Sequence, residues 1–379
     1  MQFVTSRSEA LDKLNKFIEN DISNYNTKRN FDFGAINRSN VSCLSPYITH
    51  RLITEYETAK LVLKKHPFQK VDKFIQEIFW RVYWKGWLEL RPKVWNDFID
   101  DLKIIKEDDE YLKAINGETE IVCFNDWINE LKNFNYLHNH TRMLFASIWI
   151  FTLRLPWQKG AEFFMKHLYD GDAASNTLSW RWVAGIQTKG KNYLAQSWNI
   201  SKFTNNKYKN VKINEIALPI IDKREYKISP IKINNNEELN KHLIIFENEM
   251  FINFNEIKKY KKIFFVLISN ESRSLKLSKK VLDFKKSIIN SQLNDIKYEA
   301  ELLDENSFIN FTLTFKSFDV IYPSIGENLS FLKRLIKKNH LKINYITRKE
   351  DEFCWRFSNK GYFNFKSNLP IILSTFKLN

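Results

Sequence analysis

The sequence is poor in cysteine, and the few cysteines that it has are scattered. Cys43, Cys123 and Cys354 are the only three in 379 residues. Their spacing lacks the pairs of a zinc site, and three are too few for an all-cysteine iron–sulfur cluster. They also imply no disulfide framework. We therefore expect no metal site.

Long apolar runs and glycine-rich phosphate loops are also missing. No run reaches the roughly 18 apolar residues of a membrane span, and the N-terminus has no apolar core of a signal peptide. We expect a cytoplasmic protein without membrane association. Only nine glycines occur, and none form a G-x-G-x-x-G turn or a P-loop. A nucleotide cofactor, if held, is therefore not held by a Rossmann glycine turn.

Positive charge and aromatic residues are abundant. The formal net charge is +15, and aromatic residues make up 15% of the chain, with eleven tryptophans. This balance favours anionic partners, nucleic acid above all. Part of the lysine excess is what an AT-rich genome produces. A chain of this length usually forms two domains.

The apolar spacing over residues 56–90 is helical rather than alternating. It places Glu77, Trp80, Arg81 and Trp84 on one helix face. Two interpretations remain for this face. It is either a functional surface or an ion pair buried under aromatic rings, and the presence of an acid, a base and two indoles favours function.

The stretch from Asn135 to Tyr193 organises the chain. Asn139, Arg142 and Met143 are spaced to project together from a helix. The strongly apolar residues 144–155 predict a central helix.

A second helix is expected to begin after Pro156. Gly171 breaks it between Asp170 and Asp172, and a resumed helix would align Asp172 with Asn176 and Trp180. The two carboxylates suit either acid/base hydrolysis or acceptance of hydrogen bonds from ribose hydroxyls or a ring N–H. The second interpretation, with a nearby arginine as counter-charge, is favoured because the sequence gives no sign of a sugar site.

Residues 206–240 are rich in Lys and Asn and predict a linker. From residue 241, short β-rich runs alternate with amphipathic helices, which predicts a small α/β unit with a parallel sheet. Residues 353–379 are expected to be aromatic and irregular.

Five ordered motifs resemble the FAD-binding domain of the DNA photolyase and cryptochrome family. They are SCLSPYI (42–48), EIFWRVYW (77–84), LHNHTRM (137–143), PWQKGAEFFMKHLYDGDAASN (156–176) and SWRW (179–182). The resemblance implies an all-α FAD-binding domain over residues 1–205, a linker over 206–240, and a Rossmann-like α/β domain over 241–379. Because the family normally has its α/β domain first, this order implies a short, circularly permuted member whose antenna chromophore is unknown.

The resemblance also implies roles for individual residues. The expected FAD contacts are Tyr25, Ser42, Leu44, Ser45, Arg81, Asn139, Arg142, Asp170, Asp172 and Asn176. The expected catalytic residues are Glu77, Asn139, Asn176 and the electron-carrying Trp180 and Trp157, with Trp95 and Trp127 as candidates for an outer relay member. The expected substrate contacts are Glu77, Trp80, Met143 and Trp182.

The implied activity is that of a deoxyribodipyrimidine photo-lyase. Such an enzyme, expected here as a monomer, repairs cyclobutane pyrimidine dimers in DNA by electron transfer from photoexcited reduced FAD. The alternative is a cryptochrome-like photoreceptor with the same flavin and no repair activity.

Overall fold

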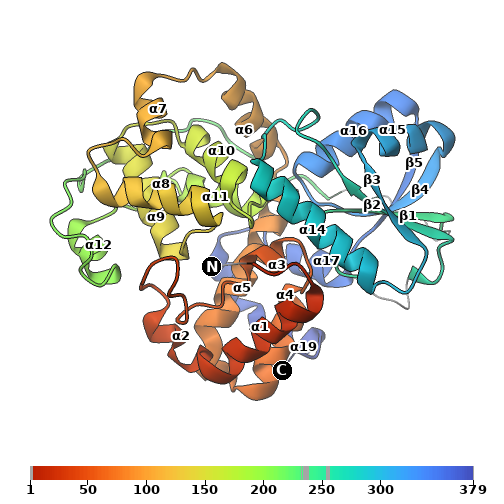
Figure 1. Ribbon diagram of the computed structural model, residues 1–379, viewed down its shortest axis with the longest axis horizontal. Coiled ribbons are helices and arrows are strands. Elements are labelled where there is room, and N and C mark those ends of the chain that lie inside the picture. Colours follow the sequence, from red (N-terminus) through yellow and green to blue (C-terminus); the bar gives the residue numbers. More distant parts are fainter. Residues whose placement is uncertain (1–2, 232, 234–238, 253–256, 379) are drawn as a thin grey trace.

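A computed structural model describes residues 3–231, 233, 239–252 and 257–378. The first half is helical and the second half contains a five-stranded parallel sheet (Figure 1), so the expected fold class is confirmed. The helices of the first half are α1 (Arg7–Asn20), α2 (Ile22–Lys28), α3 (Ser45–Thr49), α4 (Glu55–Lys65), α5 (Phe68–Glu89), α6 (Lys93–Ile104), α7 (Asp109–Asn116), α8 (Val122–Phe134), α9 (Asn139–Ser147), the π-helix η1 (Ile148–Thr152), α10 (Trp157–His167), α11 (Ala173–Val183) and α12 (Ser197–Phe203).

Helix α5 is the long central element of the helical part. Its buried positions, among them Val71, Phe74, Ile75 and Phe79, recur at helical spacing, so one apolar stripe faces the core. The helix packs against α2, α4 and α11. It therefore connects the N-terminal helices α2 and α4 to α11 within the helical part.

The expected central apolar helix is present as α9 followed by η1. The residues of η1 lie in a π-helical turn, and four of the five are buried. Single π-helical turns occur frequently at functional sites. Trp149 lies in this turn and is fully buried.

The five strands of the second half match the expected β-rich runs and lie in the order β3-β2-β1-β4-β5, all parallel. The strands and helices of this unit are β1 (His242–Phe246), β2 (Lys262–Leu267), α14 (Lys279–Asp295), β3 (Ala300–Asp304), α15 (Glu305–Thr314), β4 (Ser317–Ile321), α16 (Glu327–Asn339) and β5 (Lys342–Ile346). The strand order reverses between β1 and β4, and this is the place where open α/β sheets form a crevice at the carboxyl ends of their strands.

Alternation along β1 directs its side chains to two cores. Ile244 and Phe246 join the cluster under α15 and α16, whereas Leu243 and Ile245 join the large cluster that includes α14 and the helical part. Helix α14 lies between the sheet and the helical part (Figure 1). The two halves of the chain therefore share one continuous core.

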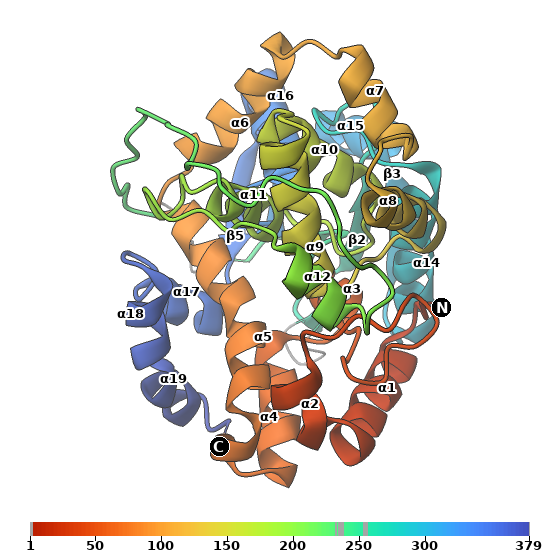
Figure 2. The same ribbon diagram turned by 90° about the vertical axis from the view of Figure 1, so that its left-hand side faces the viewer.

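The last segment is not irregular, as its aromatic composition suggested, but forms α17 (Lys349–Trp355), α18 (Tyr362–Ser367) and α19 (Leu369–Thr375). Helices α17 and α18 pack against α5 (Figure 2). Gly86 of α5 allows this packing, because a Cβ there would lie 2.6 Å from atoms of Trp355 and Ser358. The division into 1–205, 206–240 and 241–379 stays a prediction. On these contacts we propose that the α/β unit ends near Ile346.

Residues 206–231 run as an extended segment without helix or strand, apart from turns. Backbone hydrogen bonds from Ile220 to Ala184 and from Ser229 to Leu90 hold it against the helical part. Among the described residues, no helix has the length and apolar character needed to cross a membrane.

Candidate functional site

The helical part encloses a cavity of about 710 Å³, within the ~300–1,000 Å³ that ligand pockets span. We call it the main cavity. It is lined by residues from α5, α9, α10, α11 and α12 and from the loops beside them, including Arg29 and Asn30 just after α2. The predicted site residues that line it are Glu77, Trp80, Arg81, Asn139, Arg142, Met143, Asp170, Asn176, Trp180 and Trp182.

One wall comes from α5. Glu77, Trp80, Arg81 and Trp84 all line the main cavity, so the shared face expected from their spacing is confirmed. The indole of Trp80 stacks on the ring of Tyr362 from α18, with 3.3 Å between centroids and 11° between planes. The C-terminal helices thus fix the orientation of an indole at the cavity.

The opposite walls come from α9 and α11. Asn139, Arg142 and Met143 line the cavity together, as their spacing predicts. Trp182 also faces the cavity, and its ring stacks on that of Tyr193 at 5.7 Å. Two indoles from different elements are therefore each held by a second ring.

A narrower side arm of about 180 Å³ continues from the main cavity toward α3. It is lined by the remaining predicted cofactor contacts Tyr25, Ser42, Leu44 and Ser45. The arm and the main cavity share Arg29, Asn30, Glu77, Arg81, Asn139, Arg142 and Asp170. The fold thus brings nearly all predicted contacts to two adjoining spaces that share seven lining residues.

Asp170 lies where the arm meets the main cavity, and its two carboxylate oxygens differ. Its Oδ2 accepts hydrogen bonds from the Ser45 hydroxyl and from Arg142 Nη2, the latter at 2.9 Å. Its Oδ1 is buried and has no hydrogen-bond partner among the described residues, and the same is true of Nη1 of Arg81. Because buried polar groups are normally hydrogen-bonded, these two atoms suit a ligand that offers both a donor and an acceptor.

The donor set fits a flavin dinucleotide. Three guanidinium groups, those of Arg29, Arg81 and Arg142, line this space with two carboxylates, Glu77 and Asp170. The excess of positive charge suits a pyrophosphate. The free acceptor on Asp170 suits a ring N–H or a ribose hydroxyl.

Glu77 lies beside Arg29, with 4.0 Å between the carboxylate and the guanidinium Nε. Burial raises the pKa of Glu77, and the charges of Arg29 and Lys73 oppose that rise. The carboxyl group is thus available as a polar contact at the junction of both spaces. Its pairing partner Arg29 was not predicted from the sequence, because 48 residues separate the two.

Asp172 does not face the main cavity. It is the N-cap of α11, and its Oδ1 accepts a hydrogen bond of 2.6 Å from the Ser175 backbone N–H. The predicted alignment with Asn176 and Trp180 is therefore wrong, because a capping side chain turns back over the helix start. Burial alone would raise the pKa of Asp172, but Lys85, Arg81 and the Ser175 hydrogen bonds lower it below its ordinary value.

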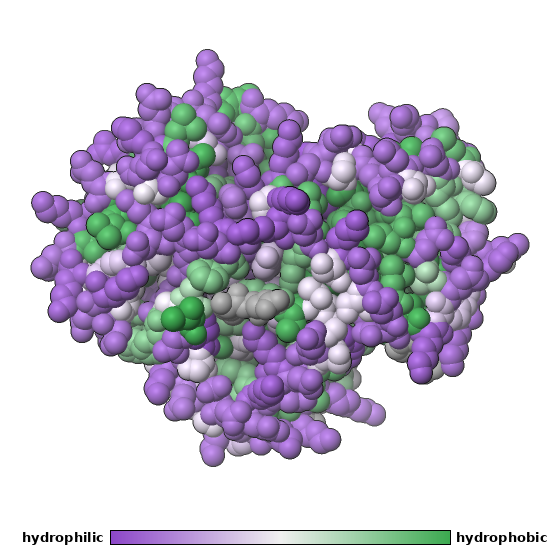
Figure 3. All heavy atoms as spheres, viewed as in Figure 1, coloured by the Kyte–Doolittle hydropathy of each residue, from purple (hydrophilic) through white to green (hydrophobic). Residues whose placement is uncertain are grey.

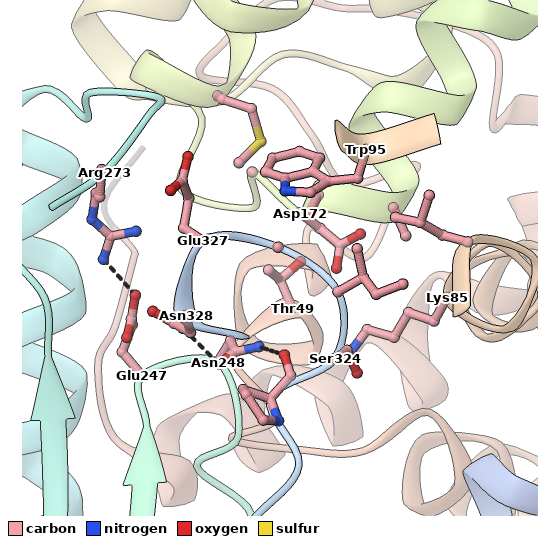
Figure 4. Close-up of a pocket in the computed structure, with 18 of the residues that line it drawn as sticks. Thr49, Lys85, Trp95, Asp172, Glu247, Asn248, Arg273, Ser324, Glu327 and Asn328 are labelled. Atoms are coloured by element: carbon pink, nitrogen blue, oxygen red, sulfur yellow. Dashed lines mark hydrogen bonds and ion pairs between the residues drawn. The ribbon is translucent and has the colours of Figure 1, made fainter. Parts of the chain in front are cut away.

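Asp172 instead lines a second, small pocket of about 70 Å³ (Figure 4). This pocket lies between the helical part and the carboxyl edge of the sheet, where Glu247 and Asn248 follow β1 and residues 323–328 follow β4. An ion pair of 2.6 Å between Arg273 and Glu247 borders it. Direct contact of Asp172 with a ligand in the main cavity stays a prediction.

Trp157 also lies away from the cavity walls. It is buried and stacks on Phe98 at 5.4 Å, and Phe98 contacts Trp95 at 5.6 Å. Trp127 contacts Tyr208 instead. Trp95 is therefore linked to Trp157 through one ring, whereas Trp127 belongs to another part of the core.

Residues of the cavity that sequence reasoning missed include Trp198 and Tyr193. Trp198 is 62% exposed at α12, beyond every recognised motif. A single exposed indole does not contribute to a periodic apolar pattern, so nothing in the sequence indicated that Trp198 lines the cavity. The face of the molecule shown in Figure 3 is largely hydrophilic, consistent with the lysine-rich composition.

The match to a known family lies in the helical part. Residues 74–213 match the family model described as the FAD binding domain of DNA photolyase. A deoxyribodipyrimidine photo-lyase from Agrobacterium fabrum is 33% identical over 184 residues, covering 46% of this chain and 37% of the relative. One from Buchnera aphidicola subsp. Baizongia pistaciae is 27% identical over 200 residues, covering 48% and 39%.

Among solved structures, a bacterial class III photolyase from Agrobacterium tumefaciens has a TM-score of 0.46 and 26% identity, covering 53% of this chain and 43% of that one. The cryptochrome of Synechocystis has a TM-score of 0.47 at 20% identity, covering 54% and 44%. In these alignments the chain spans about two fifths of the length of the curated relatives that it matches, 39% and 37% for the two above.

Proposed function

The chain belongs to the DNA photolyase and cryptochrome family and has its FAD-binding domain, and on this premise we propose that it repairs cyclobutane pyrimidine dimers in DNA with light. The observation that supports the proposal is that predicted cofactor contacts and predicted substrate contacts line the same cavity. Cofactor contacts such as Asp170 and Asn176 line the same main cavity as the indoles Trp80 and Trp182.

The two indoles supply stacking surfaces for a pair of bases that has left the duplex. Enzymes that act on a base inside DNA extrude it into a pocket and hold it between aromatic or apolar side chains. Stacking on an aromatic ring contributes about 1–3 kcal/mol per base. Because Tyr362 and Tyr193 already orient Trp80 and Trp182, little conformational freedom is lost on binding.

In this proposal, one group of residues contacts the cofactor and another contacts the substrate. When bound, FAD supplies the photochemistry, since its reduced form transfers one electron to the dimer after absorbing blue light. Asp170, Ser45 and Arg142 form a preformed hydrogen-bonded group that positions it. Glu77 and Met143 face the space next to the indoles, where a dimer would lie.

The decisive experiment is to record the absorption spectrum of the purified protein and then to illuminate it with a dimer-containing oligothymidine under reducing conditions. We expect flavin bands and a light-dependent recovery of the thymine absorbance. Flavin bands without recovery would contradict repair. A protein without flavin, even after reconstitution with FAD, would contradict the cofactor as well.

Glu77→Ala tests the assignment of the carboxylate to the substrate side. We expect most of the repair yield to be lost while the FAD content stays near that of the wild type, because Asp170 and Arg142 still hold the cofactor. The ratio of repaired dimers to bound flavin measures this. Glu57→Ala, which removes a partly buried ion pair with Arg7 outside the cavity, serves as the control. Equal loss of flavin and repair would make Glu77 a structural residue.

A photoreceptor without repair activity is the second candidate, and the stacking of Tyr362 on Trp80 favours it. This contact connects the cavity to the C-terminal helices and so offers a route by which a change at the flavin reaches the surface. Light-dependent change in protease sensitivity of residues 349–378, without dimer repair, would support it.

A further inference from the structure

Trp180 contacts a chain of aromatic rings that leads away from the main cavity but does not include Trp157. Its ring contacts among the described residues are those with Phe145, Trp149 and Phe164. The centroids of Trp180 and Trp149 lie 6.2 Å apart at 82°. Since phenylalanine is not readily oxidised, Trp149 is the oxidisable ring in direct contact with Trp180.

Gly160 of α10 makes this contact possible. A Cβ at Gly160 would lie 2.2 Å from Trp180 and 3.0 Å from Nε1 of Trp149. The glycine thus lies at the junction of both indoles and allows them to approach each other. The π-helical turn η1 carries Trp149 to the same junction.

From Trp149 the chain of rings continues to Tyr111 on α7, at 6.0 Å and 84°. The Tyr111 phenol approaches the surface, where Lys159 lies 5.6 Å from its ring. Lys159 in turn pairs with Glu107 at 2.9 Å and with Glu162 at 3.0 Å, and the Glu107 side chain is 51% exposed. The last ring of the chain therefore has both charged neighbours and solvent close by.

We propose that Trp149 and Tyr111 form an electron relay that refills Trp180 from the surface of α7. The proposal rests on the proposed function, because a photoexcited flavin is the oxidant of Trp180. One electron leaves Trp180, one then moves from Trp149 to Trp180, and one moves from Tyr111 to Trp149. Tyr111 releases its phenolic proton to the adjacent carboxylates or to solvent, and an external thiol finally returns one electron and one proton to it.

The surroundings of each ring explain why the oxidised site moves outward. In the part of the chain that the structure describes, the Nε1–H of Trp180 is buried without a hydrogen-bond partner, and that of Trp149 donates to the Pro156 carbonyl at 2.9 Å. Neither has a base that removes the indole proton, so neither oxidised indole is trapped. Tyr111 is different because an oxidised phenol is a strong acid. Burial, Glu107 and Glu162 raise the pKa of its resting phenol to about 12, and Lys159 opposes them, so it starts protonated.

Flash photolysis of the FAD-loaded protein tests the relay by the identity of the final radical. We expect a tyrosyl radical in the wild type and a tryptophanyl radical in Tyr111→Phe, with severalfold faster return of the electron. Trp149→Phe should abolish the tyrosyl signal and most steady-state photoreduction. Trp157→Phe should retain the tyrosyl signal. Trp355→Phe, which removes an equally buried indole outside the chain of rings, is the matched control.

The flavin content of each variant separates relay failure from folding failure, and Tyr111→Phe is conservative enough to fold in any case. A tyrosyl radical that survives in Tyr111→Phe, or photoreduction lost in Trp157→Phe but kept in Trp149→Phe, would overturn the relay and leave the proposed function intact. A wild-type protein that binds FAD but shows no photoreduction would overturn the relay and the proposed electron transfer through Trp180.

Discussion

Single polar atoms determine how this cavity holds a ligand. Asp170 accepts hydrogen bonds from Ser45 and Arg142 with one carboxylate oxygen, and its other oxygen is buried with no partner among the residues that the structure describes. Leaving a buried acceptor unpaired costs about 1–3 kcal/mol. That cost is recovered only when a ligand supplies the missing donor, so the turn is preorganised for binding at the expense of stability.

Asn176 is the residue that we predict to lie beside the redox-active ring of FAD. Its Nδ2 donates to the Ala161 carbonyl at 2.8 Å, which fixes the side chain at the cavity wall. We expect Asn176→Ala to retain FAD but to lower its midpoint potential, because a polar group beside the reduced flavin is lost. Spectroelectrochemical titration measures this. Ser179→Ala, also at the cavity, is the control, and an unchanged potential in Asn176→Ala would contradict the placement of Asn176 beside the redox-active ring.

At the scale of elements, the turn between α10 and α11 directs two neighbouring carboxylates, those of Asp170 and Asp172, to different places. Helix α10 ends at His167 and α11 begins at Ala173, so Asp170 lies in the turn while Asp172 caps the following helix. The cap satisfies a backbone N–H that would otherwise lack a partner. The two aspartates thereby face different pockets.

Substitution of Asp172 distinguishes capping from direct contact with the cofactor. We expect Asp172→Ala to lower the free energy of unfolding by about 1 kcal/mol, because the N-cap hydrogen bond is lost. Asp172→Asn keeps an acceptor at the cap and should cost less. Urea unfolding measures both, and FAD titration should give similar affinities for Asp172→Asn and the wild type. A large loss of FAD affinity in Asp172→Asn would show that the carboxylate contacts the cofactor.

At the scale of the whole molecule, buried polar contacts join the helical part to the sheet. Arg51 pairs with Asp351 at 2.6 Å and with Glu249 at 3.4 Å, and all three are buried. At the end of α5, Glu89 accepts hydrogen bonds from the Tyr322 hydroxyl at 2.8 Å and from the Ile325 N–H at 2.7 Å. The site helix α5 is therefore fixed at its far end by the loop after β4.

The Glu89 contact predicts a pH dependence of stability. Burial raises its pKa to about 7 from an ordinary 4.5, and the hydrogen bonds from Tyr322 and Ile325 oppose the rise. As pH increases, the Glu89 carboxyl therefore loses its proton at a lower pH in the unfolded chain than in the folded protein. The stabilisation from protonated Glu89 is complete below about pH 4.5 and is lost as pH rises through about 7, by about 3 kcal/mol at most.

Glu89→Gln should remove this part of the pH dependence. Relative to the wild type, the variant should gain stability between pH 5 and pH 8, measured by urea unfolding at both values. Glu118→Gln, at an exposed carboxylate, should show no such gain. A stability difference between Glu89→Gln and the wild type that is constant with pH would contradict the raised pKa.

The sequence by itself determined the elements and the residues that share an element face. Helical spacing predicted that Glu77, Trp80 and Arg81 line one wall, and the same reasoning holds for Asn139, Arg142 and Met143. Alternation of β-rich runs with amphipathic helices predicted the parallel sheet. These inferences succeed because side chains three or four residues apart on a helix are neighbours whatever surrounds it.

Only the tertiary structure decided which faces meet. Arg29, just after α2, lies beside Glu77 of α5; Tyr362 stacks on Trp80 although it is far away in the sequence; and Trp149 rather than Trp157 contacts Trp180. Asp172 does not line the main cavity because it lies at the start of α11, where its side chain caps the helix. Such contacts depend on packing between distant segments, and local periodicity carries no information about which segments pack together.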